Sequence, residues 1–570
     1  MTLSLKTKNP VNYITAGVLL VLCVVMILFL KSEFNQMQTK ETVYFGKNEN
    51  IVAIHKLSEW NENLQTTNSG AGDSLVYEIK GMDDEGNYVD GDTVVILGGV
   101  HANEPAGVVS ATWIIENLHP KSGTVYVTMH ANEAGFTCTD PQEASPMFFT
   151  IDTGAGERIF RYGSRVTNPI YQWPDPDIYV HSSGMKLAGS ETRNLNRCYP
   201  GVEDGTISQQ VAYAITNMVK TTDAAFEVDM HEASPEYKTI NTTVYYSLGQ
   251  NVAAAAAFNV PSDMESDSGK MGTDIAPETL RGLSHIELGT WTDTLSFLME
   301  TSNAAQGREH GKTGSNLVVT GMDKFYIRNQ ANVGLWDLTY GKDPTTGKTT
   351  TDQTTYIEVS DDNYVDSEGN SVTYFRALSQ RCARHLTFVA ALSQGYNEEF
   401  EKCIISLANA EQGENGKALT DEEKAAIFDS VGMGWSDITE RYIYKDRAGY
   451  QQYEECVEKI AAKEAETGTT LTTEEKNEIF AEIGLVWDEA TSSYAFSEDF
   501  VGYVNFGLDL TDNFYTDIRD NLYGDLAPEE GVLTSDSVWT IDNANFPVSI
   551  TYSGTTQSIV SNSGEVLATN

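Results

Sequence analysis

The sequence predicts an α/β fold in which a mostly parallel or mixed sheet is covered by helices on both faces. Short apolar runs of strand length alternate with segments of helical periodicity, and residues 207–218 place apolar side chains three or four positions apart. Strands that alternate with helices are typical of sheets buried on both sides. The expected strands are residues 94–97, 125–129, 225–230, 244–248 and 295–299.

Length and composition limit the classes to which the protein can belong. Its 570 residues exceed one ordinary hydrophobic core, so we expect two or more domains. The hydrophobic content of 40% and the aromatic content of 10% are typical of globular proteins. A formal net charge of -45 argues against a nucleic-acid partner, because phosphate binding needs clustered Lys and Arg side chains. The charge indicates an acidic, soluble surface.

An apolar segment near the N-terminus predicts a transmembrane anchor at residues 14–30. The segment contains no charged residue and spans ~26 Å as a helix, close to the ~30 Å hydrocarbon core of a bilayer. Lys6 and Lys8 precede it, which places residues 1–13 in the cytoplasm and the rest of the chain outside the cell membrane. A cleaved signal peptide is the alternative, but no small-x-small cleavage site follows Leu30.

After the anchor, changes in composition divide the chain into a stalk, an α/β domain, a repeat region and a C-terminal segment. Polar residues 31–74 are expected to form a stalk that leads to an α/β domain at residues 75–400. Within that domain, residues 341–369 are rich in Thr, Gly and Asp, which favours a surface insertion or hairpin, and a helical run at residues 374–400 closes the domain. The final segment, residues 504–570, is rich in Ser, Thr and Val and is predicted to be β-rich.

Residues 401–503 contain an internal repeat. The segment LTDEEKAAIFDSVGMGW at residues 419–435 matches LTTEEKNEIFAEIGLVW at residues 471–487, at an offset of 52 residues. Two modules of this size are predicted, each a helix pair that ends in aromatic-rich residues. Cys403 and Cys456 occupy equivalent positions, and we interpret them as small buried hydrophobic residues rather than as a disulfide.

Two segments predict ligands for a catalytic zinc ion, which needs three protein ligands and an open position. In VVILGGVHANEPAG, residues 94–107, an apolar strand leaves the sheet through two glycines and is followed by His101 and Glu104. In FEVDMHE a second strand-like run ends in His231. Functional loops gather at the carboxyl ends of strands in α/β proteins, so we expect these three side chains to meet.

Two further segments supply a base and a carboxylate-binding group. The run LSFLME ends in Glu300, which is placed to move a proton during hydrolysis of an amide, although a solvated acid at a strand end is the simpler alternative. The segment RNLNRCYPG offers Asn196 and Arg197, because a guanidinium group binds a carboxylate through two parallel hydrogen bonds. A structural Arg that satisfies loop carbonyls is the alternative there.

The motifs GGVHANEPAG, NLNRCYPG, DMHEAS and FLMETS, in this order, resemble those of the succinylglutamate desuccinylase/aspartoacylase family, within the zinc carboxypeptidase A-like superfamily. The resemblance covers residues 75–400 and implies a phosphorylase/hydrolase-like mixed-sheet α/β sandwich. It implies one Zn²⁺ held by the residues that match the family's ligands, a general base at Glu300, and a carboxylate-binding pair at Asn196 and Arg197. The implied ligands are His101, Glu104 and His231.

The chain departs from the family pattern at two points. Asn194 stands where the family usually has Asp, so the groups that support the substrate-binding arginine are expected to differ. The family also has an arginine that stabilises the oxyanion, and Arg193 is our candidate for it.

The leading hypothesis is a membrane-anchored, extracytoplasmic zinc metallohydrolase that cleaves an amide bond next to a substrate carboxylate. Its substrate is a small peptide, as for a carboxypeptidase, or an N-acyl amino acid, as for a deacylase. The alternative is a catalytically inactive surface binding or structural protein that works through its C-terminal repeats and a cell-surface partner. A third possibility is that the repeats cap or gate the cleft.

Overall fold

A computed structural model of the chain describes most of its residues, and the surface insertion predicted at residues 341–369 lies outside the described part. The described residues are 10–38, 43–140, 145–234, 241–266, 271–277, 279–307, 313–321, 377–411, 418–527, 538–539, 548–553, 556–561 and 566–569.

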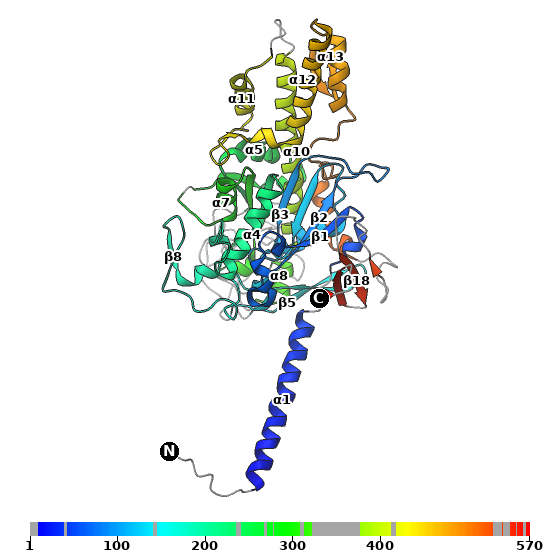
Figure 1. Cartoon of the computed structure of the whole chain (residues 1–570). Coiled ribbons are helices and arrows are strands. Elements are labelled where there is room, and N and C mark those ends of the chain that lie inside the picture. Colours follow the sequence, from blue (N-terminus) through cyan, green and yellow to red (C-terminus); the bar gives the residue numbers. More distant parts are fainter. Residues whose placement is uncertain are drawn as a thin grey trace, which may run out of the picture.

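The centre of the chain is an eight-stranded mixed sheet, which confirms the predicted α/β class (Figure 1). In spatial order its strands are β1 (Ile51–Lys56), β2 (Leu75–Lys80), β4 (Thr124–Thr128), β3 (Thr93–Leu97), β9 (Ala224–Ala233), β12 (Leu295–Ser302), β10 (Thr242–Tyr245) and β11 (Gly272–Ile275). The four middle strands, from β4 to β12, are parallel. Antiparallel pairs flank them, β2 with β4 and β10 with β12. The carboxyl ends of β3, β9 and β12 therefore meet at one edge.

Helices cover both faces of this sheet. They are α3 (Pro105–Asn117), α4 (Ile207–Thr221), α5 (Gln250–Asn259), α7 (Ser284–Trp291) and α10 (Leu378–Glu411). Val94 and Ile96 of β3 point into a hydrophobic cluster with α3, α5 and α10, whereas Val95 and Leu97 point into a second cluster with α4 and α7. Successive side chains of a strand face opposite sides, so burial on both faces explains the continuous apolar run. The predicted helix at residues 207–218 is α4.

Short elements surround these layers. Two hairpins consist of β5 (Phe148–Thr153) with β6 (Gly156–Arg161) and β7 (Ile178–Val180) with β8 (Lys186–Ala188). Short helices are α2 (Asn63–Thr66), α6 (Ser262–Ser266) and α8 (Ser315–Thr320).

The N-terminal helix α1 (Pro10–Gln38) is the predicted apolar segment, and its window Tyr13–Lys31 has a mean hydropathy of 2.9. It is long and apolar enough to cross a membrane, and its length and composition also fit a signal sequence. The stalk predicted for residues 31–74 is wrong from residue 43 onwards. Val43, Phe45 and Leu57 are buried and β1 pairs with β2, because this segment supplies an edge strand whose few apolar residues all face the core.

The predicted boundary at residue 400 falls inside α10, which runs without a break through 34 residues from the sheet into the repeat region. The two segments of the predicted repeat contain the same elements in the same order: a helix whose first turn is capped by a threonine, then a two-stranded hairpin. The first has α11 (Asp421–Ser430), β13 (Trp435–Ser436) and β14 (Arg441–Tyr442), and the second has α13 (Thr473–Phe480), β15 (Leu485–Asp488) and β16 (Ser493–Phe496). Helix α12 (Ala448–Thr467) joins them.

Cys403 and Cys456 are buried free thiols, as predicted. The C-terminal segment, residues 504–570, is β-rich only in part. It begins with an irregular stretch and α14 (Phe514–Asp525), whose Tyr515 and Leu522 are buried in the same hydrophobic cluster as α10. A four-stranded antiparallel sheet follows, made of β17 (Val538–Trp539), β18 (Val548–Ser553), β19 (Thr556–Ser561) and β20 (Val566–Thr569).

Candidate metal centre and hydrolase site

Three neighbouring strands bring the predicted site residues to one edge of the sheet. His101 lies in the loop after β3, His231 lies near the end of β9, and Glu300 of β12 is the direct cross-strand neighbour of His231. The turn out of β3 needs glycine at Gly99, where φ is +65° and an added Cβ would lie 2.5 Å from the carbonyl oxygen of Met129. This tight exit lets the chain reach Glu104 and Pro105, which begins α3.

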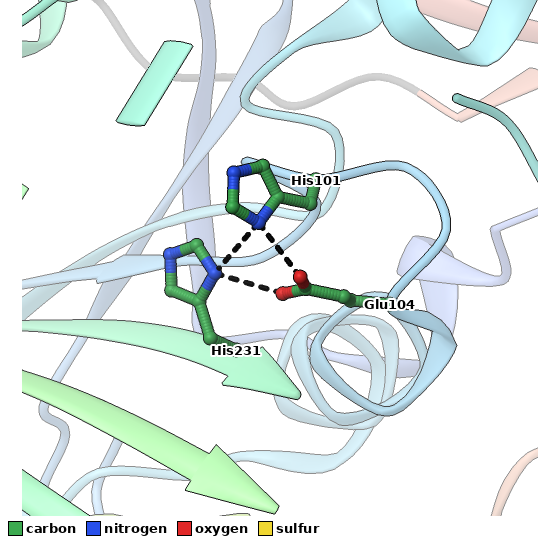
Figure 2. Close-up of side chains that lie close together, drawn as sticks. All are labelled: His101, Glu104 and His231. Atoms are coloured by element: carbon green, nitrogen blue, oxygen red, sulfur yellow. Dashed lines mark hydrogen bonds and ion pairs between the residues drawn. The ribbon is translucent and has the colours of Figure 1, made fainter. Parts of the chain in front are cut away.

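His101, Glu104 and His231 converge on a single point (Figure 2). The Nδ1 atom of His101 lies 2.7 Å from Oε1 of Glu104, and the Nδ1 atom of His231 lies 2.8 Å from Oε2 of the same carboxylate. The two Nδ1 atoms are 3.1 Å apart. All three side chains are buried, and their candidate ligand atoms lie within 4.8 Å of one another.

The outer nitrogen of each imidazole is held by an oxygen acceptor. Nε2 of His101 donates to Oδ1 of Asn194 at 2.9 Å, and Nε2 of His231 donates to Oδ2 of Asp229 at 2.8 Å. The hydroxyl of Ser284 donates to the same Asp229 oxygen at 2.5 Å. These contacts hold a proton on Nε2 of each ring, so Nδ1 is the atom that faces the shared point and would bind a metal.

This donor set fits a zinc ion. Two imidazole nitrogens and one carboxylate are a common ligand set for catalytic Zn²⁺, and outer oxygen acceptors are the usual support for such histidines. Two Nδ1 lone pairs at 3.1 Å repel each other unless a proton or a cation lies between the rings. His101, Glu104 and His231 would therefore hold the metal.

Burial and the charged side chains around this cluster shift the pKa values of His101, Glu104 and His231 in different directions in the metal-free protein. Burial, together with the nearby Arg165, lowers the pKa of His101 to about 4. Burial also disfavours a charged His231, but Asp229 and Glu104 outweigh it and raise the pKa of that imidazole well above its usual value. Burial alone would raise the pKa of Glu104, yet the two histidines lower it well below its usual range. His231 and Glu104 thus form an ion pair that a metal ion would replace.

Glu300 lies beside this cluster, and one of its carboxylate oxygens, Oε2, is buried and makes no hydrogen bond to the described residues. Burial raises the pKa of the Glu300 carboxyl to about 8 in the metal-free protein, while the nearby His231 opposes the rise. A carboxyl group whose pKa lies near neutrality can both accept and return a proton.

Glu300 shares a cavity of about 550 Å³ with the ligands His101 and Glu104 and with Arg165, Asn196 and Arg197. The Asn196 side chain is fixed, because its Oδ1 accepts the backbone N–H of Ser284 at 2.8 Å. The Arg197 guanidinium donates to the Asn196 carbonyl at 2.5 Å. The structure thus brings the predicted base, carboxylate-binding pair and ligands together.

Arg193 lies outside this arrangement, so the oxyanion role expected for it is wrong. Its guanidinium binds Asp175 through two hydrogen bonds of 2.7 and 2.9 Å and donates to the carbonyl of Thr167. Arg165 reaches the cavity instead, with Nη1 3.2 Å from Nδ1 of His101 and 3.3 Å from Oε1 of Glu104. Arg165 follows the β5–β6 hairpin in an irregular loop, where no local pattern marks it.

Asn194 contacts His101 of the candidate metal centre rather than supporting the guanidinium group of Arg197. Its Oδ1 accepts from His101 and from the backbone N–H of Asn196 at 3.0 Å, and its Nδ2 donates to Glu191 at 2.8 Å. The replacement of Asp by Asn therefore removes a negative charge next to a metal ligand, which lowers the basicity of His101.

Comparisons with known proteins give solved structures but no sequence match. A scan against family models finds none, and a search of curated proteins finds none. Similar structures include a succinylglutamate desuccinylase/aspartoacylase from Rhodobacter sphaeroides, with 19% identity, a TM-score of 0.25, and coverage of 40% of this chain and 51% of that one. An aspartoacylase family protein from Mesorhizobium loti has 15% identity, a TM-score of 0.25, and coverage of 40% and 56%. A metallo-carboxypeptidase from Burkholderia cenocepacia has 10% identity, a TM-score of 0.25, and coverage of 40% and 52%.

The chain thus spans about half the length of each of these structures. Because the TM-scores are low, the functional assignment rests on the motifs and side-chain geometry of the chain itself.

Proposed function

We propose that the protein is a zinc-dependent amide hydrolase that acts next to a substrate carboxylate and is anchored in the cell membrane by α1, with its catalytic domain outside the cytoplasm. The observation that carries this proposal is the convergence of His101, Glu104 and His231, with both outer imidazole nitrogens held by oxygen acceptors, beside a cavity that Glu300 lines. The orientation follows from the lysines that precede the anchor.

The chemistry divides among the residues of the cavity. Zinc, when bound, supplies Lewis acidity toward the substrate carbonyl and toward water. Glu300 takes a proton from the attacking water and returns it to the leaving nitrogen, so its unpaired Oε2 serves in both steps. Arg165 donates hydrogen bonds to the carbonyl oxygen as negative charge develops there, and Arg197 pairs with the substrate carboxylate.

The substrate is a short peptide cleaved at its C-terminus or an N-acyl amino acid, since both place a free carboxylate next to an amide. Competing both classes against the full-length protein in detergent distinguishes them. We expect zinc-dependent release of an amino acid from one class and at least tenfold slower release from the other. Glu300→Gln is the control, because it keeps the volume of the side chain and removes the base.

The alternative, an inactive binding protein that works through its repeats, predicts a different outcome. A chain without enzymatic function has no physical need for three converging metal ligands beside a cavity that holds a base and two arginines. Absence of hydrolysis from both substrate classes by zinc-loaded protein, with the wild type and Glu300→Gln indistinguishable, would establish the binding role and overturn the hydrolase proposal.

A further inference from the structure

A second cavity, of about 420 Å³, lies on the first repeat between α11 and the β13–β14 hairpin. Its aromatic wall is Trp435, Tyr442 and Tyr444. Tyr444 stacks on Phe428 at a ring distance of 3.5 Å, and the edge of Trp435 meets Tyr442 at 5.6 Å. The wall is therefore fixed by its own packing, while 49% of the Trp435 surface stays exposed. The polar wall consists of Asp421, Glu422, Asp429, Glu440, Arg441 and Lys445.

Trp435 also lines a smaller cavity of about 170 Å³ against the sheet domain. Hydroxyl and carboxyl side chains line this smaller cavity, among them Thr290, Thr292, Ser436 and Asp437. The indole thus stands between two adjacent polar cavities. A linear ligand bound against the indole would therefore have polar side chains from both cavities near it.

The second repeat has the same hairpin, but different side chains occupy the space between its helix and its hairpin. Trp487 and Tyr494 pair across it with rings 5.1 Å apart, as Trp435 and Tyr442 do in the first repeat. At the position equivalent to Ala425, however, the second repeat has Asn477, which accepts a 2.7 Å hydrogen bond from the Tyr494 hydroxyl. Tyr494 is only 1% exposed. In the first repeat, the small side chains of Ala425 and Ala426 in α11 leave room for the cavity.

The lining favours a neutral, polyhydroxylated ligand. The four carboxylates can accept hydrogen bonds from hydroxyl groups. Lys445, and Arg441 whose guanidinium also binds Asp446, can donate hydrogen bonds to hydroxyl oxygens. The electron-rich face of an indole attracts the polarised C–H groups on the face of a sugar ring. Four carboxylates against two cations would repel an anionic ligand, and a cationic peptide is the competing occupant that the binding experiment includes. We propose that the first repeat carries a saccharide-binding site centred on Trp435, which takes a linear chain of neutral or N-acetylated sugars.

The place of the site in the molecule suits a polymer partner. Figure 1 shows α11 at the end of the molecule opposite α1. A chain anchored by α1 would present Trp435 away from the membrane, toward extracellular polysaccharide.

Binding of defined tetrasaccharides tests this proposal. Cellotetraose and the tetramer of N-acetylglucosamine are titrated into the full-length protein by calorimetry, in a detergent without a sugar headgroup. We expect at least one of them to bind with a Kd of about 1 mM or tighter. Trp435→Ala should weaken binding at least tenfold, and Ala425→Asn, which copies the second repeat, should do the same. Glu440→Gln, at the exposed turn of the hairpin, tests the polar wall without disturbing buried side chains.

Trp487→Ala is the matched control, because it removes the equivalent indole of the second repeat and should leave binding unchanged. Unfolding midpoints of all variants confirm that they fold. Two outcomes overturn the proposal: neither tetrasaccharide binds with a Kd of about 1 mM or tighter, or Trp435→Ala binds as tightly as the wild type. Binding of a lysine tetrapeptide, dependent on Trp435 and without any saccharide binding, would assign the site to cationic peptides instead.

Discussion

The candidate metal centre and the cavity of the first repeat are held in place by different interactions. At the metal centre, His101 and His231 are buried, and a hydrogen bond to each outer nitrogen fixes the direction of its lone pair. In the repeat, Trp435 is half exposed, and Ala425 lines the space beside it at the position where the second repeat has Asn477. Substitutions near the candidate metal site should therefore lower kcat strongly. Substitutions in the repeat should change the size of its cavity and leave kcat unchanged.

One helix connects the two regions. At the beginning of α10, Arg381 donates to the buried Glu232, the residue after His231, at 2.5 Å. Near its end, Asn409 accepts the backbone N–H of Tyr494 in the second repeat at 2.6 Å. Point variants can show whether the regions act independently despite this shared helix.

Glu300→Gln should have the largest effect. Loss of the base should lower kcat about 10³-fold with zinc content unchanged, because the ligands stay intact. Trp435→Ala should leave kcat toward a small substrate at the wild-type value. Steady-state kinetics of both variants, with metal analysis, make the comparison. A Glu300→Gln enzyme that retains wild-type kcat would show that another group moves the proton.

Arg165→Met should lower kcat about 10²-fold with a smaller change in KM, because its hydrogen bonds strengthen as charge develops on the carbonyl oxygen. Arg193→Met is the matched variant, and its kcat should stay within about threefold of wild type because Asp175 binds that guanidinium away from the cavity. If Arg193→Met lost more activity than Arg165→Met, the assignment of the two arginines would be reversed.

Asn194→Ala should weaken zinc binding about 10-fold to 100-fold, because Nε2 of His101 loses the acceptor that orients its ring. Asn217→Ala, at an amide on α4 that donates to the Trp60 carbonyl, should leave zinc affinity unchanged. Competition against a chelator of known affinity measures both constants. Equal affinities in the two variants would remove Asn194 from the support of the metal centre.

Zinc affinity should also depend on pH. In the metal-free protein Asp229 and Glu104 raise the pKa of His231 well above its usual value, so the ring is protonated at neutral pH and must lose a proton to bind zinc. Affinity should then fall about tenfold for each pH unit below the raised pKa, with release of about one proton per zinc. Calorimetry in buffers of different ionisation enthalpy counts that proton, and binding without proton release would contradict the charge assignment.

Much of the fold could be predicted from apolar runs alone, because strands buried on both faces leave a continuous signal, as in β3. The edge strand β11 leaves no such signal, since all four of its residues are exposed. The convergence of His101, Glu104 and His231 could be predicted because they lie at or just beyond the carboxyl ends of neighbouring strands. Asp229 was missed although its position two residues before His231 puts both side chains on one face of β9. Arg165 was beyond prediction, because only the tertiary path of its loop brings it to the cavity.

Metal content tests the central claim most directly. The purified full-length protein and its His231→Ala variant are incubated with Zn²⁺, passed through a desalting column and analysed for metal by mass spectrometry. Three ligands at one point predict about one zinc per wild-type chain and a loss of tight binding in the variant. Equal zinc content in the two proteins would contradict a metal centre at His101, Glu104 and His231.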